Sequence, residues 1–128
     1  MVTFDTVREL ALSLPAVEEG LTWGTPAFKV PHKLKGKKKG LARLLETGAL
    51  MVHIDTADKE HLIRARPETY FETAHYAGYP AVLVRLDQID RDELSDLLVA
   101  SWRFVMPPKL LAAAGGPEAP RRQPRQRP

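Results

Sequence analysis

Between residues 17 and 55 the chain divides into short β-prone segments separated by turn residues. The expected strands cover residues 17–23, 27–30, 41–45 and 50–55. Two of the connections are the turn-forming runs Gly24-Thr25-Pro26 and Glu46-Thr47-Gly48-Ala49. Strands joined by such turns run antiparallel, because a parallel pair needs a crossover of about a dozen residues or more. This part of the chain therefore predicts a mainly antiparallel sheet.

Three amphipathic helices are expected around these strands, over about residues 5–14, 57–64 and 90–106. The third is marked most clearly, because Asp90 and Glu93 have the spacing of a capping box. Its stripe of core-facing positions is Leu94, Leu97, Leu98, Ser101 and Val105. Asp55 or Thr56 is expected to cap the second helix.

Two more strands are expected between the second and third helices. Residues 69–73 predict a short edge strand, and residues 81–86, the most β-prone run, predict an interior one. An antiparallel sheet commonly buries one face under helices and leaves the other in water. The sequence therefore predicts an α+β fold of two layers, with a mainly antiparallel sheet and the helices packed on one face.

The length of 128 residues suits a single domain that needs no disulfide or metal to stabilise its core. We assign this domain to residues 1–111, and we expect residues 112–128, rich in proline and arginine, to form a disordered basic tail. The chain has no cysteine. It also has no apolar run near the roughly 20 residues of a membrane helix and no signal-peptide pattern. We expect a cytoplasmic protein without a membrane partner.

Charge is distributed unevenly along the sequence. Residues 29–43 hold seven lysines and arginines and no acidic residue, and residues 107–128 hold five basic residues and one acidic residue. The rest of the chain has seven basic and fifteen acidic residues. A polyanion responds to local potential rather than to the overall charge, so the two basic segments are its expected points of contact.

The first candidate site is the basic segment, in which residues 33–40 predict a lysine-rich loop between two strands. Its cations could neutralise several phosphates, which predicts weak, salt-sensitive DNA binding that is indifferent to base sequence. The alternative is a solvated loop without a partner. The residues assigned to this site are Lys29, Lys33, Lys35, Lys37, Lys38, Lys39 and Arg43.

The second candidate site is the aromatic loop at residues 75–80, which leads into the interior strand. A ligand or protein could bind at an edge formed by Trp23, His75, Tyr76 and Tyr79. The alternative is an ordered loop whose rings cover the core and whose polar ends reach water. Trp23 and Trp102 are themselves expected to be packing residues, as large aromatic side chains usually are.

No pattern in the sequence indicates an enzyme. The three serines lie in predicted helices, and no G-x-S-x-G motif is present. His53, Asp55 and His61 come nearest to a set of metal ligands, but their spacing matches no zinc site, and we expect two surface histidines and a helix-capping aspartate. We therefore expect no catalytic residue, cofactor or metal.

Four segments occur together in one order along the chain: residues 12–19, residues 23–30, residues 75–84, and Trp102-Arg103 followed by Pro108-Lys109-Leu110. In these segments, which span about residues 4–111, the sequence resembles the MmcQ/YjbR family. The resemblance implies a two-layer α+β domain, related in shape to secretion-chaperone-like and frataxin-like folds. It also implies DNA binding, by analogy with a double-wing arrangement in which a curved sheet faces the duplex. It implies no catalytic residues.

The sequence departs from the family pattern after Val30, where residues 33–40 replace a short, tight turn. This lysine-rich insert favours DNA binding in this chain, whereas the acidic remainder of the body argues against it. Two functions stay open: non-specific DNA binding through the lysine-rich loop and the sheet face, and a non-enzymatic ligand- or protein-interaction module using residues 75–79. An exposed sheet face could also pair two copies, so we expect a monomer or a weak homodimer.

Overall fold

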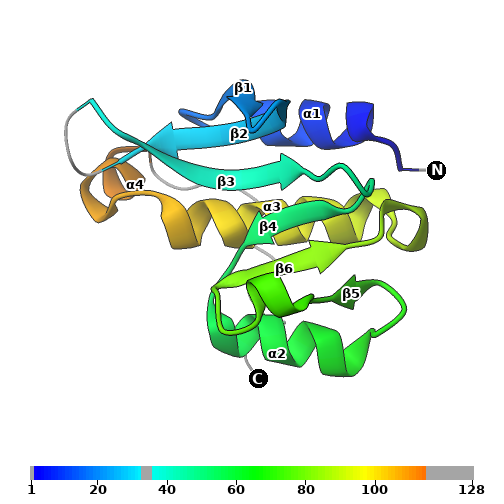
Figure 1. The fold of residues 1–128 in the computed structure, drawn as a ribbon. Helices are drawn as coiled ribbons and strands as arrows, with labels where there is room; N and C mark the ends of the chain where they lie inside the picture. The colour runs from blue at the N-terminus through cyan, green and yellow to red at the C-terminus, as the bar shows by residue number, and fades with distance from the viewer. Residues whose placement is uncertain (1, 33–35, 115–128) are drawn as a thin grey trace.

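The computed structural model describes residues 2–32 and 36–114. The described residues form one six-stranded sheet and four α-helices (Figure 1). The strands are β1 (Glu18–Thr22), β2 (Thr25–Pro31), β3 (Lys38–Leu44), β4 (Leu50–His53), β5 (Tyr70–Phe71) and β6 (Ala81–Val84). The helices are α1 (Phe4–Leu12), α2 (Thr56–Ala65), α3 (Arg91–Val105) and α4 (Pro108–Ala114), with short 3-10 helices η1 (Ala74–Tyr76) and η2 (Leu86–Gln88). The strand order is β1-β2-β3-β4-β6-β5, and every neighbouring pair is antiparallel.

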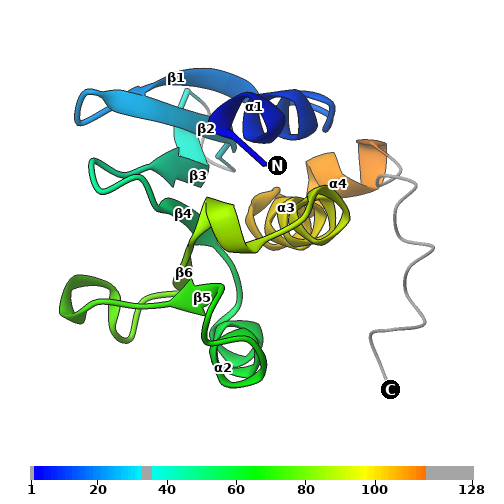
Figure 2. The ribbon, with the colours of Figure 1, turned by 90° about the vertical axis from the view of Figure 1, so that its right-hand side faces the viewer.

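The helices lie on one side of this sheet, as Figure 2 shows. α3 packs against β3 and β4, α1 lies beside α3, and α2 lies against β5 and β6. The strand residues buried beneath them are Phe28, Val30, Leu41, Leu50, Val52, Val82 and Val84. The predicted two-layer α+β fold is therefore confirmed.

The predicted amphipathic helix at the C-terminal end of the fold is α3. The Asp90 carboxylate accepts a hydrogen bond from the Glu93 backbone N–H at 2.8 Å, which caps its first turn. All five residues of the predicted stripe are buried. The Trp102 indole N–H donates to the Pro15 carbonyl at 2.8 Å, so the helix is also tied to the chain just after α1. Trp102 is a packing residue, as predicted.

The β1–β2 hairpin differs from its prediction in two ways. The turn consists of Trp23 and Gly24 rather than residues 24–26, since Thr22 pairs directly with Thr25 and Pro26 lies within β2. Trp23 and Gly24 have φ of 53° and 82°, and positive φ at both central residues is what a two-residue type I′ hairpin requires. This turn lifts Trp23 off the sheet and leaves it 84% exposed, so its predicted packing role is wrong.

The lysine-rich segment is more regular than predicted. Lys38, Lys39 and Gly40 belong to β3 rather than to a loop, because β2 and β3 stay paired as far as Pro31 and Lys38. The His32 backbone N–H donates to the Lys37 carbonyl at 2.9 Å, which holds the strand ends together beyond that pair. Residues 33–35, and with them Lys33 and Lys35, lie outside the described residues.

The remaining elements follow the sequence pattern closely. β6 is buried at all four positions, as expected of an interior strand, and β5 is the predicted edge strand. α4 continues to Ala114, past the predicted start of the tail at residue 112, and residues 115–128 lie outside the described part of the chain. Over the described residues, no helix combines the length and the apolar character needed to cross a bilayer.

Candidate functional site

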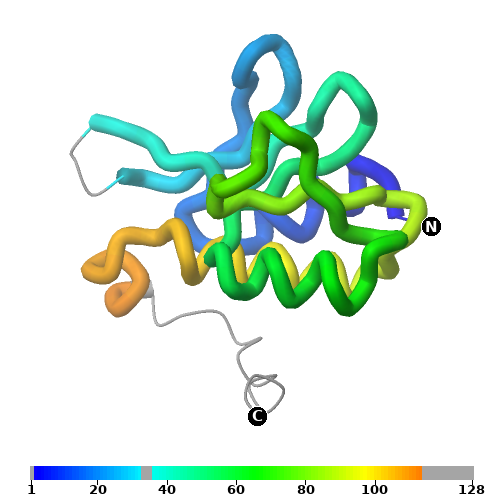
Figure 3. The backbone as a smooth tube through the Cα atoms, turned by 60° about the horizontal axis from the view of Figure 1, so that its bottom comes forward, coloured from blue at the N-terminus to red at the C-terminus, as the bar shows by residue number. Residues whose placement is uncertain are grey.

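The face of the sheet opposite the helices carries a cavity of about 320 Å³. The β1–β2 turn, the β3–β4 turn and the loop after β5 all rise on this side, away from the helices (Figure 3). Among the residues lining the cavity are Trp23, Lys29, Lys38, Arg43, His53, His75 and Tyr76. Members of both predicted sites, the basic segment and the aromatic loop, therefore lie in one place. We call it the open-face cavity.

Three cations reach the open-face cavity from two neighbouring strands, Lys29 on β2 and Lys38 and Arg43 on β3. Lys38 pairs with Glu18 at 2.6 Å, and both side chains are largely exposed. Such an exposed pair contributes little to stability, so a phosphate could replace the carboxylate at low cost. Two more predicted residues, Lys37 and Lys39, are exposed but do not line the cavity.

Arg43 also fixes the hairpin that carries Trp23. Its Nη1 donates to Thr25 Oγ1 at 2.8 Å and to the Thr22 carbonyl at 3.3 Å. Within the described residues these contacts use Nη1 alone, and a guanidinium has five N–H donors. Arg43 can therefore brace the hairpin and still donate to an anion in the cavity.

The tip of the β1–β2 hairpin contains locally unfavourable features. A positive φ costs a bulky residue such as Trp23 roughly 1–2 kcal/mol compared with the ordinary regions. Thr22 Oγ1 is buried and finds no hydrogen-bond partner among the described residues. Strain of this kind persists only where the surrounding structure enforces it, and it occurs often at binding sites.

The aromatic wall of the cavity comes from η1 and the residues after it. The His75 and Tyr76 rings meet edge-on with centroids 4.8 Å apart, and Tyr76 and Tyr79 meet edge-on at 6.3 Å. Tyr76 also packs on Met51, Ala81 and Leu83, a small apolar cluster on this face of the sheet. The loop covers one end of the face, as the packing alternative predicts, and lines the cavity at the other end. Ligand or protein binding by this loop stays a prediction.

A buried lysine that the sequence analysis missed supports this loop. Lys59, on α2, is 2% exposed, and its Nζ donates to the Tyr76 and Tyr79 carbonyls at 2.8 Å each. It also pairs with Glu72 at 2.6 Å. All three of its N–H donors are therefore used. Lys59 stands three and four residues before the inward-facing Leu62 and Ile63, and residues at this spacing share one face of a helix. This spacing is the sequence signal that could have revealed its burial.

His53 lies in the wall of the cavity at the end of β4. A Cβ atom added at Gly40 would come within 3.1 Å of its Nε2, so the glycine leaves room for the imidazole. Burial, and to a lesser extent the charge of Lys39, lowers the pKa of His53 below its usual value. The ring is therefore neutral near pH 7 and adds a polar group, not a charge, to the cavity.

The three residues considered as metal ligands have separate roles. The Asp55 carboxylate accepts a hydrogen bond from the Ala57 N–H at 3.0 Å and caps α2, as predicted. His61 is exposed on α2, whereas His53 lines the cavity instead of lying on the surface. Among the residues that the structure describes, no cluster of His, Asp or Glu is arranged to hold a metal ion.

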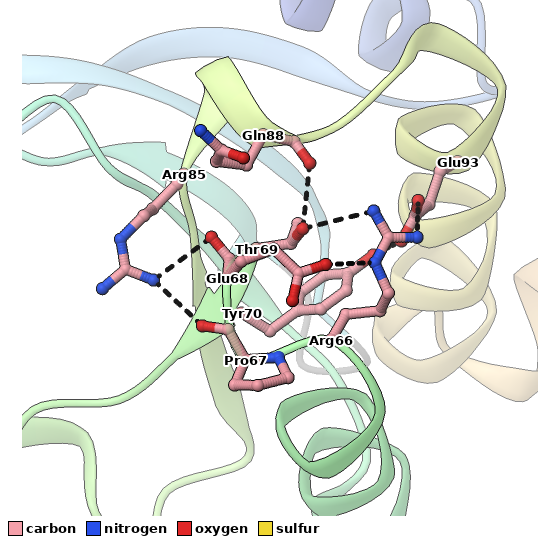
Figure 4. Close-up of polar contacts among 8 residues, drawn as sticks. All are labelled: Arg66, Pro67, Glu68, Thr69, Tyr70, Arg85, Gln88 and Glu93. Carbon is pink, nitrogen blue, oxygen red and sulfur yellow. Dashed lines mark hydrogen bonds and ion pairs between the residues drawn. The ribbon is translucent and has the colours of Figure 1, made fainter.

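A second group of polar side chains joins α2, β5 and α3 (Figure 4). The Tyr70 hydroxyl donates to Glu93 at 2.5 Å, and Arg66 pairs with Glu93 at 3.0 Å and with Glu68 at 2.8 Å. Burial, followed by the bond to Glu93, raises the pKa of Tyr70, so the phenol keeps its proton. These contacts brace the packed side of the fold and do not face the open-face cavity.

Comparison with known proteins agrees with this architecture. The YjbR family model matches residues 12–104. The chain belongs to the YjbR family. A crystal structure of a Deinococcus radiodurans protein with a DUF419 domain shares its fold, with a TM-score of 0.73 and 24% identity over 92% of this chain and 91% of that one.

Relatives in Mycobacterium tuberculosis and Mycobacterium bovis, each described as an uncharacterised protein, are 42% identical over 59 residues. That match covers 46% of this YjbR-family chain and 46% of each relative, so it spans about half of their length. The match to the family model confirms the family resemblance inferred from the sequence motifs. The names of these relatives state no activity, and the candidate function rests on the residues of the open-face cavity.

Proposed function

We propose that this YjbR-family domain is a non-enzymatic module that binds DNA without base-sequence specificity through the open face of its sheet. The observation that supports this most directly is the gathering of Lys29, Lys38 and Arg43 in one cavity with exposed aromatic rings. Lys37 and Lys39 add exposed positive charge on the residue before β3 and on β3 itself. Phosphate contacts of this kind position a nucleic acid without reading its bases.

The charge distribution also indicates which part of the surface would attract a polyanion. Residues 29–43 contain no acidic residue, whereas the rest of the body has more than twice as many acidic residues as basic ones. A polyanion would be repelled on average by the acidic remainder of the body and attracted to the basic segment, which includes the paired ends of β2 and β3. The acidic body argues against a continuous DNA-binding surface and favours a small binding area at the basic segment.

Fluorescence anisotropy with a labelled duplex of about 20 base pairs tests this proposal at about 50 and 200 mM salt. The background is full-length protein in which Arg121, Arg122, Arg125 and Arg127 are replaced by glutamine, so that their charges cannot dominate. On this background K29Q/K38Q, which removes two cations that line the cavity, should weaken binding about tenfold at low salt. It should also reduce the slope of log affinity against log salt by about two, since each lost phosphate contact removes roughly 0.9.

The matched control is R64Q/K109Q, which removes two exposed charges from α2 and α4. It should leave affinity close to that of the background. Equal losses in the two double variants would mean that only net charge matters and that the open face is not the site. If the background protein binds neither this duplex nor a single strand of the same length at low salt, DNA binding by the domain is refuted.

A small anionic aromatic ligand is the second candidate. The cavity volume of about 320 Å³ lies at the lower end of ligand-site sizes, and its wall combines cations with aromatic rings. A mononucleotide is a suitable probe for this alternative. Saturable binding of the mononucleotide that is as tight as binding of the duplex would favour a ligand pocket over a DNA-binding face.

A further inference from the structure

We propose that the open-face cavity selects single-stranded DNA, with a base stacked on Trp23 and the neighbouring phosphates on Lys29 and Arg43. The inference rests on the proposed DNA binding and adds the form of DNA that the site accepts. Proteins that hold single strands combine a positively charged groove with aromatic rings on which bases stack. Both components are present here within one cavity.

Trp23 is placed for stacking rather than for packing. It is 84% exposed although it lines the cavity, so its indole is available in solution. Its backbone has φ of 53° at the first central position of a turn where asparagine or glycine would be favoured. A large aromatic residue that gains little burial at an unfavourable position indicates a role in contact with a partner.

Each of the two sides of the cavity is fixed in place by its own hydrogen bonds. Arg43 holds the Trp23 hairpin through Thr22 and Thr25. Lys59 holds the Tyr76 side through two backbone carbonyls and Glu72. Because neither wall has to be ordered when a base enters, stacking incurs little conformational cost.

Stacking on Trp23 also favours a single strand over a duplex. A paired base presents only its edges, and its faces are covered by the neighbouring bases in the stack. To stack on the ring of Trp23, a paired base would have to flip out of the DNA double helix. Base flipping loses that base's pairing and stacking. A single strand exposes base faces together with the same phosphates, so it can use the rings and the cations at once.

The two tryptophans allow a direct test. Trp102 is fully buried with its N–H bonded to the Pro15 carbonyl, so quenching of intrinsic fluorescence by DNA reports on Trp23. The probes are oligothymidylate of about 12 nucleotides, an abasic strand of the same length, and a duplex of the same length. The protein is the full-length chain with the four tail arginines replaced by glutamine.

We expect oligothymidylate to quench the fluorescence and to bind about tenfold more tightly than the abasic strand, which has the phosphates without the bases. Because the Trp23 variants lack this fluorescent reporter, all affinities are measured by fluorescence anisotropy of end-labelled strands, and quenching is used only for the protein that keeps Trp23. Trp23→Ala should reduce the affinity for oligothymidylate to that for the abasic strand and leave the latter unchanged. Trp23→Phe should restore most of the difference. Leu21→Ala is the control, because Leu21 is 70% exposed on the same hairpin and has no ring to stack.

Two results would overturn the inference while leaving the proposed function intact. One is equal affinity for oligothymidylate and the abasic strand, with no effect of Trp23→Ala. The other is tighter binding of the duplex than of the single strand. If none of the three probes binds at about 50 mM salt, the proposed function itself fails, and the inference fails with it.

Discussion

The two faces of the sheet share their strands but are used in opposite ways. Along β4, Leu50 and Val52 point under the helices and are fully buried, whereas Met51 and His53 point to the open side. The tryptophans differ in the same way, since Trp102 is 0% exposed on the helix side and Trp23 is 84% exposed on the other. On the helix face apolar side chains are packed, whereas on the other face polar, charged and aromatic side chains line the open-face cavity.

The open face is itself divided. Near β6 a small cluster of Met51, Ala81 and Leu83 is covered by Leu45, Phe71 and Tyr76. Toward β2 and β3 the cover ends and cations line the surface. The aromatic loop closes only the apolar part of this face, which leaves the charged part accessible.

The largest expected effect lies on the helix face. Trp102→Ala should lower the free energy of unfolding by about 3–5 kcal/mol, because it leaves a large cavity and a Pro15 carbonyl without its donor. Trp23→Ala should change it by less than about 0.5 kcal/mol, as for most exposed substitutions. Urea denaturation of both variants measures the contrast. Similar losses would mean that the two faces are not energetically distinct.

The next effect concerns the support beneath the aromatic loop. Lys59→Met should destabilise the protein by about 2–3 kcal/mol, since two carbonyls and a carboxylate lose their shared partner. Amide hydrogen exchange should accelerate over residues 74–79 before it does so in α3. Lys37→Met is the control, because Lys37 is exposed. Unchanged exchange in the loop would show that Lys59 does not fix this wall.

A smaller effect, of opposite sign, is expected at the hairpin tip. Trp23→Asn should raise the free energy of unfolding by about 0.5–1 kcal/mol, because asparagine tolerates the positive φ of the turn. The same change should abolish the discrimination between oligothymidylate and the abasic strand. Thermal unfolding alongside the binding assay would reveal a residue that serves function at the expense of stability. A destabilised Trp23→Asn variant would mean that the indole does pack in solution.

The smallest effect is a dependence on pH. Because the folded-state pKa of His53 lies below its value in the unfolded chain, the unfolded state binds more protons on acidification. The contribution of neutral His53 is therefore fully present above about pH 6.5 and is lost as the pH falls through the folded-state pKa. His53→Gln should flatten the stability profile between about pH 7 and pH 5. If the variant and the unmodified protein lose stability equally over this pH range, other groups cause the pH dependence.

Much of the packed face could be predicted from sequence. The stripe on α3, its Asp90 N-cap and the buried strand β6 follow from local patterns of residue type. Among the described residues, only the return bond of the predicted capping box is missing, since the Glu93 carboxylate binds Tyr70 and Arg66 instead. The helix-capping role of Asp55 was likewise evident from its place before α2. These predictions succeed because a core requires apolar residues at the positions that face it, and that spacing can be read along the sequence.

The open face was harder to predict, because its arrangement depends on register and turn geometry. Placing the turn one residue too late misassigned Trp23, since it made Trp23 the last residue of a packed strand when it is the first residue of the turn. The pairing of β2 with β3, which draws Lys38 and Lys39 into a strand, is a long-range contact that no local pattern encodes. For the same reason, two candidate sites that looked independent in the sequence meet in one cavity.

The ends of the sheet have a consequence for how copies of the protein can associate. β5, at one edge, is only two residues long, and β1, at the other, presents the adjacent carboxylates of Glu18 and Glu19. Short and charged edge strands are poor templates for an incoming strand. Edge-to-edge growth into fibrils from the native fold would first require β1 or β5 to detach. Any assembly that keeps the fold intact is therefore expected to use a face rather than an edge.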